Sequence, residues 1–340
     1  MFKYVEKHWK GCLIAIVLVT LAVLAGSMWR KYQAKTNSTD TKLPVDTLRS
    51  GEAYTDTYYF DQLNDSEENC YEVLKQTLDT FQGGIIEFPE ELTGEEYTRV
   101  THALQYGAQD YFYGIIGIPM TDDNRCVNYD SDVLEVKDSI IKKCVLFLSC
   151  AKNVDLKGEF DEEGYVTNLD EAQAELGTSS EDAIKEIQEE QVQVDVKLAE
   201  IVDGMPKEYG EKEAVDYFVD WMDQNLDSSQ EGESIDDMSV FFENVYKRNG
   251  VSCLIDKKVS TSGYNKVLST LCNRVGIQSH VALGQWKKDG KAYVMTYVNI
   301  DGQDIYVDAS REKSKDLWDQ KYLTRQETEN AMQMAGYINE

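Results

Sequence analysis

The chain has 340 residues, of which 42% are hydrophobic and 11% aromatic, so it can bury a substantial core and wholesale disorder is excluded. Only 22 glycines and 4 prolines are present, which excludes collagen-like and proline-rich architectures. The 62 acidic residues against 34 basic ones give a formal net charge of −28. Such a charge repels phosphate backbones, so no nucleic-acid partner is expected.

Residues 11–29 form an uncharged, mostly aliphatic run between Lys10 and Arg30. At about 1.5 Å per residue, a helix over this run is close to 30 Å long, which is the thickness of the hydrocarbon core of a bilayer. The run therefore predicts a transmembrane helix that serves as an uncleaved signal-anchor. A cleavable signal peptide is the alternative, with a poor cleavage site after Ala25. A lipoprotein anchor is not expected, because Ser27 stands where the lipidated cysteine would have to be.

Three basic residues lie on each side of this run, so the charges determine the orientation only weakly. A tail as short as residues 1–10 rarely carries its charges across a membrane, so we expect this tail to be cytoplasmic. Residues 30–52, rich in Lys, Thr, Ser and Asp, predict a flexible stalk. The chain is therefore expected to be a single-pass cell-membrane protein with its C-terminal body outside the cytoplasm.

The segment 53–178 predicts an N-terminal α+β region rich in helix. A helix is expected over 66–82, where apolar residues recur at helical spacing. The sequence Thr93-Gly94-Glu95-Glu96 has the spacing of a capping box and predicts the start of a second helix. Aromatic and β-branched residues predict strands over 111–120 and 133–149.

The segment 179–340 predicts a second domain of the α+β class. Its expected helices cover 179–202, 211–225, 234–247 and 262–275, and the last of them ends at Gly276. Its expected strands cover 279–286, 292–300 and 304–308, and the tight turn Asp301-Gly302 joins the last two. A helix packed on an antiparallel meander is a typical α+β core.

The cysteines do not define a metal site. Cys12 lies in the predicted membrane helix, which leaves six others, and no two of these have the Cys-x-x-Cys spacing of a zinc site: Cys70, Cys126, Cys144, Cys150, Cys253 and Cys272. The run 144–150 fits either a buried strand or a helix, and as a strand it would hold Cys144 and Cys150 about 20 Å apart, too far to bridge. The pairing of the six is otherwise open, although Cys272 on an apolar helical stripe is expected to be a buried free thiol. The acidic segment 223–234 lacks the glycine and glutamate of a calcium loop, so neither a metal nor a cofactor is expected.

An ordered set of short motifs spans about fifty residues: Gly263-Tyr264, Gly276-Ile277, Gly284, Asp301-Gly302 and Val307-Asp308. Their order and spacing resemble the transglutaminase-like superfamily, whose papain-like core uses a Cys-His-Asp triad. Members of that superfamily look like Cys-x-Gly-Tyr at a helix start, then Gly-Ile, a His-Ala-Trp strand, Asp-Gly and a strand ending in Val-Asp. Tyr58-Tyr59 and Tyr71 also resemble the helical region before this core in bacterial surface members.

The resemblance implies positions for the triad, but only one of them keeps its residue. Thr261 stands at the nucleophile position, Tyr293 at the base position, and Asp308 is retained as the third member. The family's chemistry needs a thiolate beside an imidazole. A hydroxyl beside a phenol of pKa about 10 supplies neither near neutral pH. The resemblance therefore implies a degenerate, non-catalytic member that binds a protein, peptide or cell-wall ligand.

Two other hypotheses stay open at this point. In the first, the domain is an active cysteine peptidase or acyltransferase that uses displaced residues, with Cys253 as nucleophile and His280 as base. This pair would need an unusual loop, because Cys253 lies eight residues before Thr261, and His280 is instead expected to be an ordinary half-exposed strand residue. In the second, the chain is a purely structural surface protein and the resemblance is accidental.

Overall fold

The computed structural model describes the following residues: 53–81, 83–108, 111, 114–120, 140–149, 167, 181–226, 254–255, 257, 259–288, 290, 292–308 and 322–334. The chain divides into two units, Met1–Leu43 and Pro44–Glu340, and every described residue belongs to the second. The predicted membrane helix at 11–29, the predicted stalk at 30–52 and the predicted helix at 234–247 lie outside the described residues. Among the helices that are described, none is both long and apolar enough to cross a membrane.

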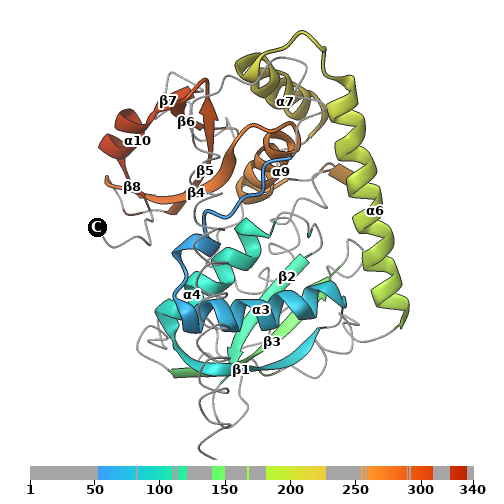
Figure 1. The fold of residues 1–340 in the computed structure, drawn as a ribbon, viewed down its shortest axis with the longest axis vertical. Coiled ribbons are helices and arrows are strands. Elements are labelled where there is room, and N and C mark those ends of the chain that lie inside the picture. The colour runs from blue at the N-terminus through green and yellow to red at the C-terminus, as the bar shows by residue number, and fades with distance from the viewer. Residues whose placement is uncertain are drawn as a thin grey trace, which may run out of the picture. The chain divides into compact units, whose positions relative to one another are not determined.

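The first part of this unit is a three-stranded antiparallel sheet with two helices. The strands are β1 (Gly84–Thr93), β2 (Gly114–Met120) and β3 (Ile140–Ser149), in the order β1-β3-β2. Helix α3 (Asp65–Asp79) follows a short 3-10 turn η1 (Phe60–Gln62), and α4 (Gly94–His102) continues into the π-helical turn η2 (Ala103–Gly107) (Figure 1). The capping box predicted at Thr93 is present, and a second one at Asn64 starts α3.

The second part contains three longer helices and a five-stranded sheet. The helices are α6 (Glu181–Gly204), α7 (Glu211–Asn225) and α9 (Thr261–Arg274). The sheet has the antiparallel order β7-β6-β5-β4-β8, formed by β4 (Ser279–Trp286), β5 (Ala292–Ile300), β6 (Gln303–Val307), β7 (Tyr322–Thr324) and β8 (Met332–Met334). The predicted helix at 262–275 and the predicted strands at 279–286, 292–300 and 304–308 are therefore confirmed within one residue at each end.

Helix α10 (Arg325–Ala331) requires the five-stranded sheet to curl. It joins β7 to β8, which are the two edges of the sheet. A flat sheet of five strands is about 19 Å across, whereas a helix of 7 residues is only about 10 Å long. The edges must therefore approach each other, and Figure 1 shows the strands and α10 arranged around a ring.

The curled sheet has two faces of different composition. Val281, Val298 and Val307 belong to the largest hydrophobic core, which also contains α9 and reaches back to Tyr59; we call this side the outer face. Because side chains alternate along a strand, their neighbours lie on the opposite side, which we call the inner face. The inner face holds a separate cluster made of Ala282, Trp286, Met295, Tyr306, Leu323 and Met332.

Strand β1 was not predicted from the sequence. It contains Pro89, which normally argues against a strand, and its pairing with β3 shifts register between Glu87 and Leu92. The proline is therefore accommodated in an irregular stretch of an edge strand, where the regular backbone hydrogen bonds to β3 are interrupted and its missing N–H costs nothing. The short β7, α10 and β8 were also not predicted. Of the run 144–150, which fits either a strand or a helix by sequence, residues 144–149 are part of β3.

Candidate functional site

Helix α9 carries the first candidate residue, Thr261, at its first position. The helix starts there because the side chain of Ser260 caps it, accepting a hydrogen bond from the backbone N–H of Gly263 at 3.2 Å. It ends at Arg274, and Gly276, two residues later, has a φ of 84°, in the left-handed region. The backbone N–H groups of Gly276 and Ile277 donate to the carbonyls of Asn273 and Cys272, which is a Schellman motif.

Asn265, one turn after Thr261, fixes the start of α9 to strand β5. This side chain is fully buried, and its Nδ2 donates to the carbonyl oxygens of Thr261 at 2.8 Å and Val294 at 3.2 Å. The two oxygens share one donor, so they are at most 6.0 Å apart. With standard backbone dimensions, this places the Cα atoms of Thr261 and Tyr293 within about 15 Å of each other.

The other two candidates, Tyr293 and Asp308, are in direct contact. The Tyr293 hydroxyl donates to Oδ2 of Asp308 at 2.8 Å. Asp308 follows β6 directly and is only 2% exposed. The Tyr293 ring packs 4.9 Å from the ring of Trp286 and belongs to the inner face, whereas its neighbour Val294 packs into the largest core. The structure thus joins Tyr293 and Asp308, to which the resemblance assigns the base and acid positions, at one end of the sheet and brings the backbone of Thr261 close to that end.

The contact between Tyr293 and Asp308 does not supply the chemistry of a Cys-His-Asp triad. A phenol that donates to a buried carboxylate holds its own proton and satisfies that carboxylate. Nothing at Tyr293 can accept a proton from a nucleophile near neutral pH, and the Thr261 hydroxyl is a weak nucleophile without such a base. What the pair supplies is a partly buried hydrogen bond that fixes the start of β5 to the residue after β6.

His280, the alternative base, is placed differently from the expectation. The sequence predicts a half-exposed strand residue, but His280 is only 8% exposed. Its ring lies between two tyrosine rings, 3.8 Å from Tyr58 and 4.4 Å from Tyr297, with both pairs nearly parallel. The expectation was wrong because Tyr58, more than two hundred residues earlier, covers the strand. Burial lowers the pKa of His280 to about 3, so its imidazole is neutral and a very weak base at neutral pH.

The cysteines that the structure describes are buried and form no disulfide: Cys70, Cys144 and Cys272. The prediction of a buried free thiol at Cys272 is confirmed, and burial raises its pKa far above the usual range. Cys253, Cys126 and Cys150 lie outside the described residues. Within the described part of the chain, no cluster of His, Cys, Asp and Glu side chains is arranged to hold a metal ion.

The sequence analysis missed two polar contacts, one of a buried lysine on α9 and one of a half-buried tyrosine on β5. Lys266 is fully buried and donates from Nζ to the carbonyl oxygen of Tyr111 at 3.0 Å. Tyr297 donates to Oδ1 of Asp304 at 2.6 Å on the inner face. No sequence signal reveals these contacts, because a buried lysine has the same helical spacing as an exposed one and its acceptor is remote in the chain.

No family model and no curated protein matches this chain. Three solved structures are similar to it: a TGase with 10% identity and a TM-score of 0.32, a presumed protease from Parabacteroides distasonis with 15% and 0.26, and a presumed cysteine protease from Cytophaga hutchinsonii with 11% and 0.27. They cover 70%, 57% and 66% of this chain, and the chain spans 56%, 36% and 67% of their own lengths. One of the three, the TGase, is of the kind that the sequence motifs resemble. With TM-scores below 0.5 these likenesses carry no argument, and the interpretation of the site depends on the contacts described above.

Proposed function

We propose that this chain is a membrane-anchored extracytoplasmic protein with a catalytically degenerate transglutaminase-like domain. In this proposal the domain is a binding or scaffolding module at the cell surface. The observation that carries it is the hydrogen bond from Tyr293 to Asp308. It occupies the place where the resemblance implies a histidine oriented by an aspartate, and a phenol there cannot act as a base near neutral pH.

The alternative function is a cysteine peptidase or acyltransferase that uses Cys253 and His280. The stacking of His280 between two tyrosines argues against it, because a general base must reach the proton it removes and must have a pKa near the working pH. A pKa of about 3 makes the imidazole a poor acceptor for a thiol proton. We therefore favour the binding module.

The membrane anchor and the location of the body form a separate part of the proposal. Their support is the uncharged run 11–29, which is long enough to span a bilayer. Protease added to intact cells should remove the acidic body. If the body survives on intact cells and is digested only after lysis, the proposed orientation is wrong.

The proposed loss of catalysis is tested by assaying the full-length protein in detergent for amine incorporation into a glutamine substrate and for peptide hydrolysis. We expect no turnover above the buffer control, since loss of a triad nucleophile typically costs several orders of magnitude in rate. Cys253→Ala and His280→Ala serve as paired variants. Turnover that either variant abolishes would replace the binding module with the cysteine enzyme.

A further inference from the structure

Helix α6 exposes apolar side chains on its outer side. Val192 and Val196 are 61% and 54% exposed, whereas Val194 and Leu198 of the same helix are completely buried in the largest core. With 3.6 residues per turn, the two exposed valines lie on one face of the helix and the buried residues lie on another. The exposed face continues in both directions from the valines, and we call its residues the α6 stripe: Lys185, Glu189, Val192, Val196, Ala199 and Asp203.

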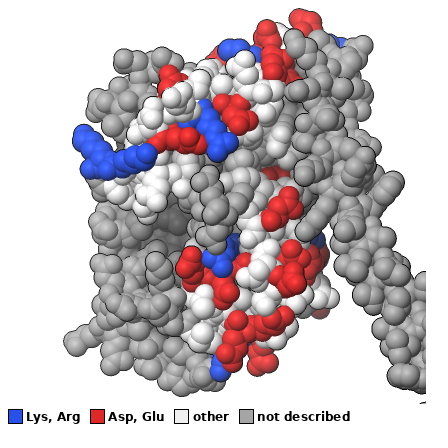
Figure 2. Space-filling model, turned by 60° about the vertical axis from the view of Figure 1, so that its left-hand side comes forward, with Lys and Arg blue, Asp and Glu red and all other residues white. Residues whose placement is uncertain are grey.

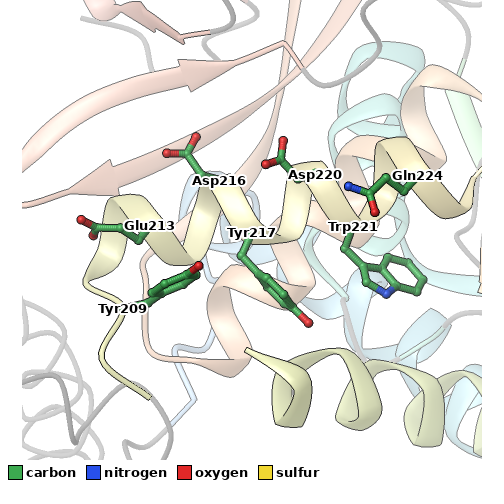
Figure 3. Close-up of a pocket in the computed structure, with 7 residues that line it drawn as sticks. All are labelled: Tyr209, Glu213, Asp216, Tyr217, Asp220, Trp221 and Gln224. Atoms are coloured by element: carbon green, nitrogen blue, oxygen red, sulfur yellow. The ribbon is translucent and has the colours of Figure 1, made fainter. Parts of the chain in front are cut away.

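The inner side of α6 is held by α7, so the stripe cannot turn inward. Two rings that line the hollow beside α7, those of Tyr217 and Trp221, lie on the side of α7 opposite to its outward carboxylates (Figure 3). The Tyr217 hydroxyl donates to the carbonyl oxygen of Ile201 on α6 at 3.3 Å, and Nζ of Lys197 lies 6.0 Å from the centre of the Trp221 ring. Figure 1 shows α6 at an edge of its unit, with α7 and α9 on one side and no described element on the other.

The charge of the molecule limits what can dock on the α6 stripe. The net charge is −28, and acidic side chains are also spread over the face drawn in Figure 2. Beside the apolar centre of the stripe, however, the negative charge is compensated within the chain. Asp195 pairs with Arg274, Glu200 pairs with Lys197 at 2.9 Å, and Gln188 is uncharged. A second helix can therefore approach the centre of the stripe without meeting an uncompensated charge.

The spacing of the α6 stripe matches that of a second copy of itself. Its members follow one another at intervals of four, three, four, three and four residues, which is the repeat of a helix that packs along another helix. These intervals read the same from either end. A copy turned by 180° about the middle of the stripe therefore puts Lys185 opposite Asp203 at both ends, Val192 opposite Val196 at the centre, and Glu189 opposite an alanine. In a parallel pair, every charged residue of the stripe would instead face its own copy.

We propose that the α6 stripe binds the α6 stripe of a second copy of this chain, antiparallel and about a two-fold axis. The valines of the two copies pack together at the centre, and Lys185 of each copy pairs with Asp203 of the other. Because the stripe is only about 27 Å long, the interface is small and the dimer is weak and reversible. This inference does not rest on the proposed function, because the stripe shares no residue with the site at α9.

The direction of the pairing is tested by treating the full-length protein in detergent with a carbodiimide, which joins an ammonium group to a carboxylate in contact with it. Mass spectrometry should find a linked peptide pair that joins Lys185 to Asp203. Within one copy these residues are 18 positions apart on one helix, or about 27 Å, so the link can form only between two copies. If dimers form without this link, the proposed pairing is wrong.

The contribution of charge is measured by sedimentation equilibrium of the same full-length protein, for which we expect a dissociation constant of about 100 μM. Lys185→Glu puts like charges together at both ends and should weaken the dimer about tenfold, whereas Lys185→Glu/Asp203→Lys should restore it to within about threefold. The matched control is Lys75→Glu, because Lys75 on α3 is also exposed and pairs with the residue four positions later. The control should change the constant less than twofold. A protein that stays monomeric at about 300 μM, or a swap that restores nothing, would overturn the proposal.

The apolar centre is tested by Val192→Ser/Val196→Ser, which should weaken the dimer at least tenfold. Its control is Ile85→Ser/Ile140→Ser, which removes two other exposed aliphatic side chains, at β1 and β3, and should have less than a twofold effect. The run 11–29 is identical in all variants, so association through that run would not respond to any of them. Equal effects of the two double variants, or no effect of either, would show that the copies do not meet at α6.

Discussion

The two faces of the curled sheet bury polar groups for different purposes. On the outer face, Asn265 and Thr296 are fully buried among aliphatic residues, and their hydrogen bonds hold α9 against β5. On the inner face, the hydroxyls of Tyr293 and Tyr297 donate to carboxylates, and the His280 ring stacks on the Tyr297 ring. The outer face is a positioning device of the kind that an active site needs, whereas the inner face offers phenols where an enzyme would need an imidazole. The scaffold and the chemistry of this site are therefore separable.

The largest effect is expected on the outer face, for Asn265→Ala. The change removes the donor for the carbonyls of Thr261 and Val294 and the acceptor for the Thr296 hydroxyl, all in a buried place. Unmade buried hydrogen bonds are costly, so we expect a loss of about 3–5 kcal/mol in the free energy of unfolding, measured by urea denaturation. Asn299→Ala, at a half-buried position of β5, is the control and should cost about 1 kcal/mol or less. If Asn265→Ala costs no more than the control, α9 is held against β5 by other contacts.

The next effect concerns the pH dependence of stability around Tyr58, which contacts two groups with opposite shifts. Burial lowers the pKa of His280 from 6.5 to about 3. Between these two pH values the unfolded chain binds a proton at this residue that the folded chain does not bind. Its contribution to stability is complete above pH 6.5 and falls by about 1.4 kcal/mol per unit as the pH drops. Burial raises the pKa of Asp56 from 3.8 to about 7, so here the folded chain holds the extra proton. The contribution of Asp56 is complete below pH 4 and is lost as the pH rises towards 7.

Two variants separate these opposing contributions. His280→Phe keeps the stacking and removes one of them, so relative to the unmodified protein its stability should improve as the pH falls from 6.5 towards 4. Asp56→Asn should show the opposite trend relative to the unmodified protein. Thermal unfolding at half-unit pH steps measures both. Parallel pH profiles for all three proteins would contradict the burial of these two groups.

A moderate effect is expected on the inner face, for Tyr293→Phe. The change leaves the ring in place beside Trp286 but removes the hydroxyl that donates to Asp308, which is 2% exposed. A buried carboxylate that loses a donor should cost about 1–3 kcal/mol of unfolding free energy. The comparison is Tyr297→Phe, whose partner Asp304 is partly exposed and can bind water instead, so this change should cost less. The reverse order would show that Asp308 is not buried as described.

The smallest effect is expected for Gly284→Ala, at the contact between β4 and the edge strand β8. A Cβ atom at this position would lie 2.8 Å from Cε of Met332 and 3.1 Å from the backbone oxygen of Gln333. The methionine end can move, but the backbone oxygen requires a shift of β8, so we expect a cost of about 1 kcal/mol. Hydrogen exchange of the β8 amides should rise in this variant. Unchanged exchange and stability would show that β8 adjusts freely.

The sequence predicts the local parts of this molecule well because their signals are local. The capping box at Thr93, the ending of α9 before Gly276 and the turn at Asp301-Gly302, both with positive φ, each depend on a few neighbouring residues. The three long strands of the second sheet follow from alternation and from that turn. The proline in β1 and the short strands β7 and β8 carry no such signal, and they form only because the rest of the sheet offers them partners.

The sequence predicts which residues form the candidate site, but it does not predict the contacts that these residues make. Motif spacing places Thr261, Tyr293 and Asp308 in chain order, and the structure joins the last two by a hydrogen bond. The burial of His280 could not be read from β4, because the residue that covers it, Tyr58, lies before the first helix. The burial of Lys266 likewise depends on a carbonyl at Tyr111. Long-range polar contacts of this kind arise from the fold as a whole.

The central claim is that Thr261, Tyr293 and Asp308 occupy the places where a thiolate, an imidazole and an acid would meet. The most direct measurement is the pH profile of alkylation of Thr261→Cys and of Thr261→Cys/Tyr293→His, each corrected for the unmodified protein. In the single variant the introduced thiol should titrate near its ordinary pKa of about 8.5. In the double variant a neighbouring imidazolium, oriented by Asp308, should lower that midpoint by one unit or more. Identical profiles for the two variants would contradict the account, because they would show that the two positions do not meet.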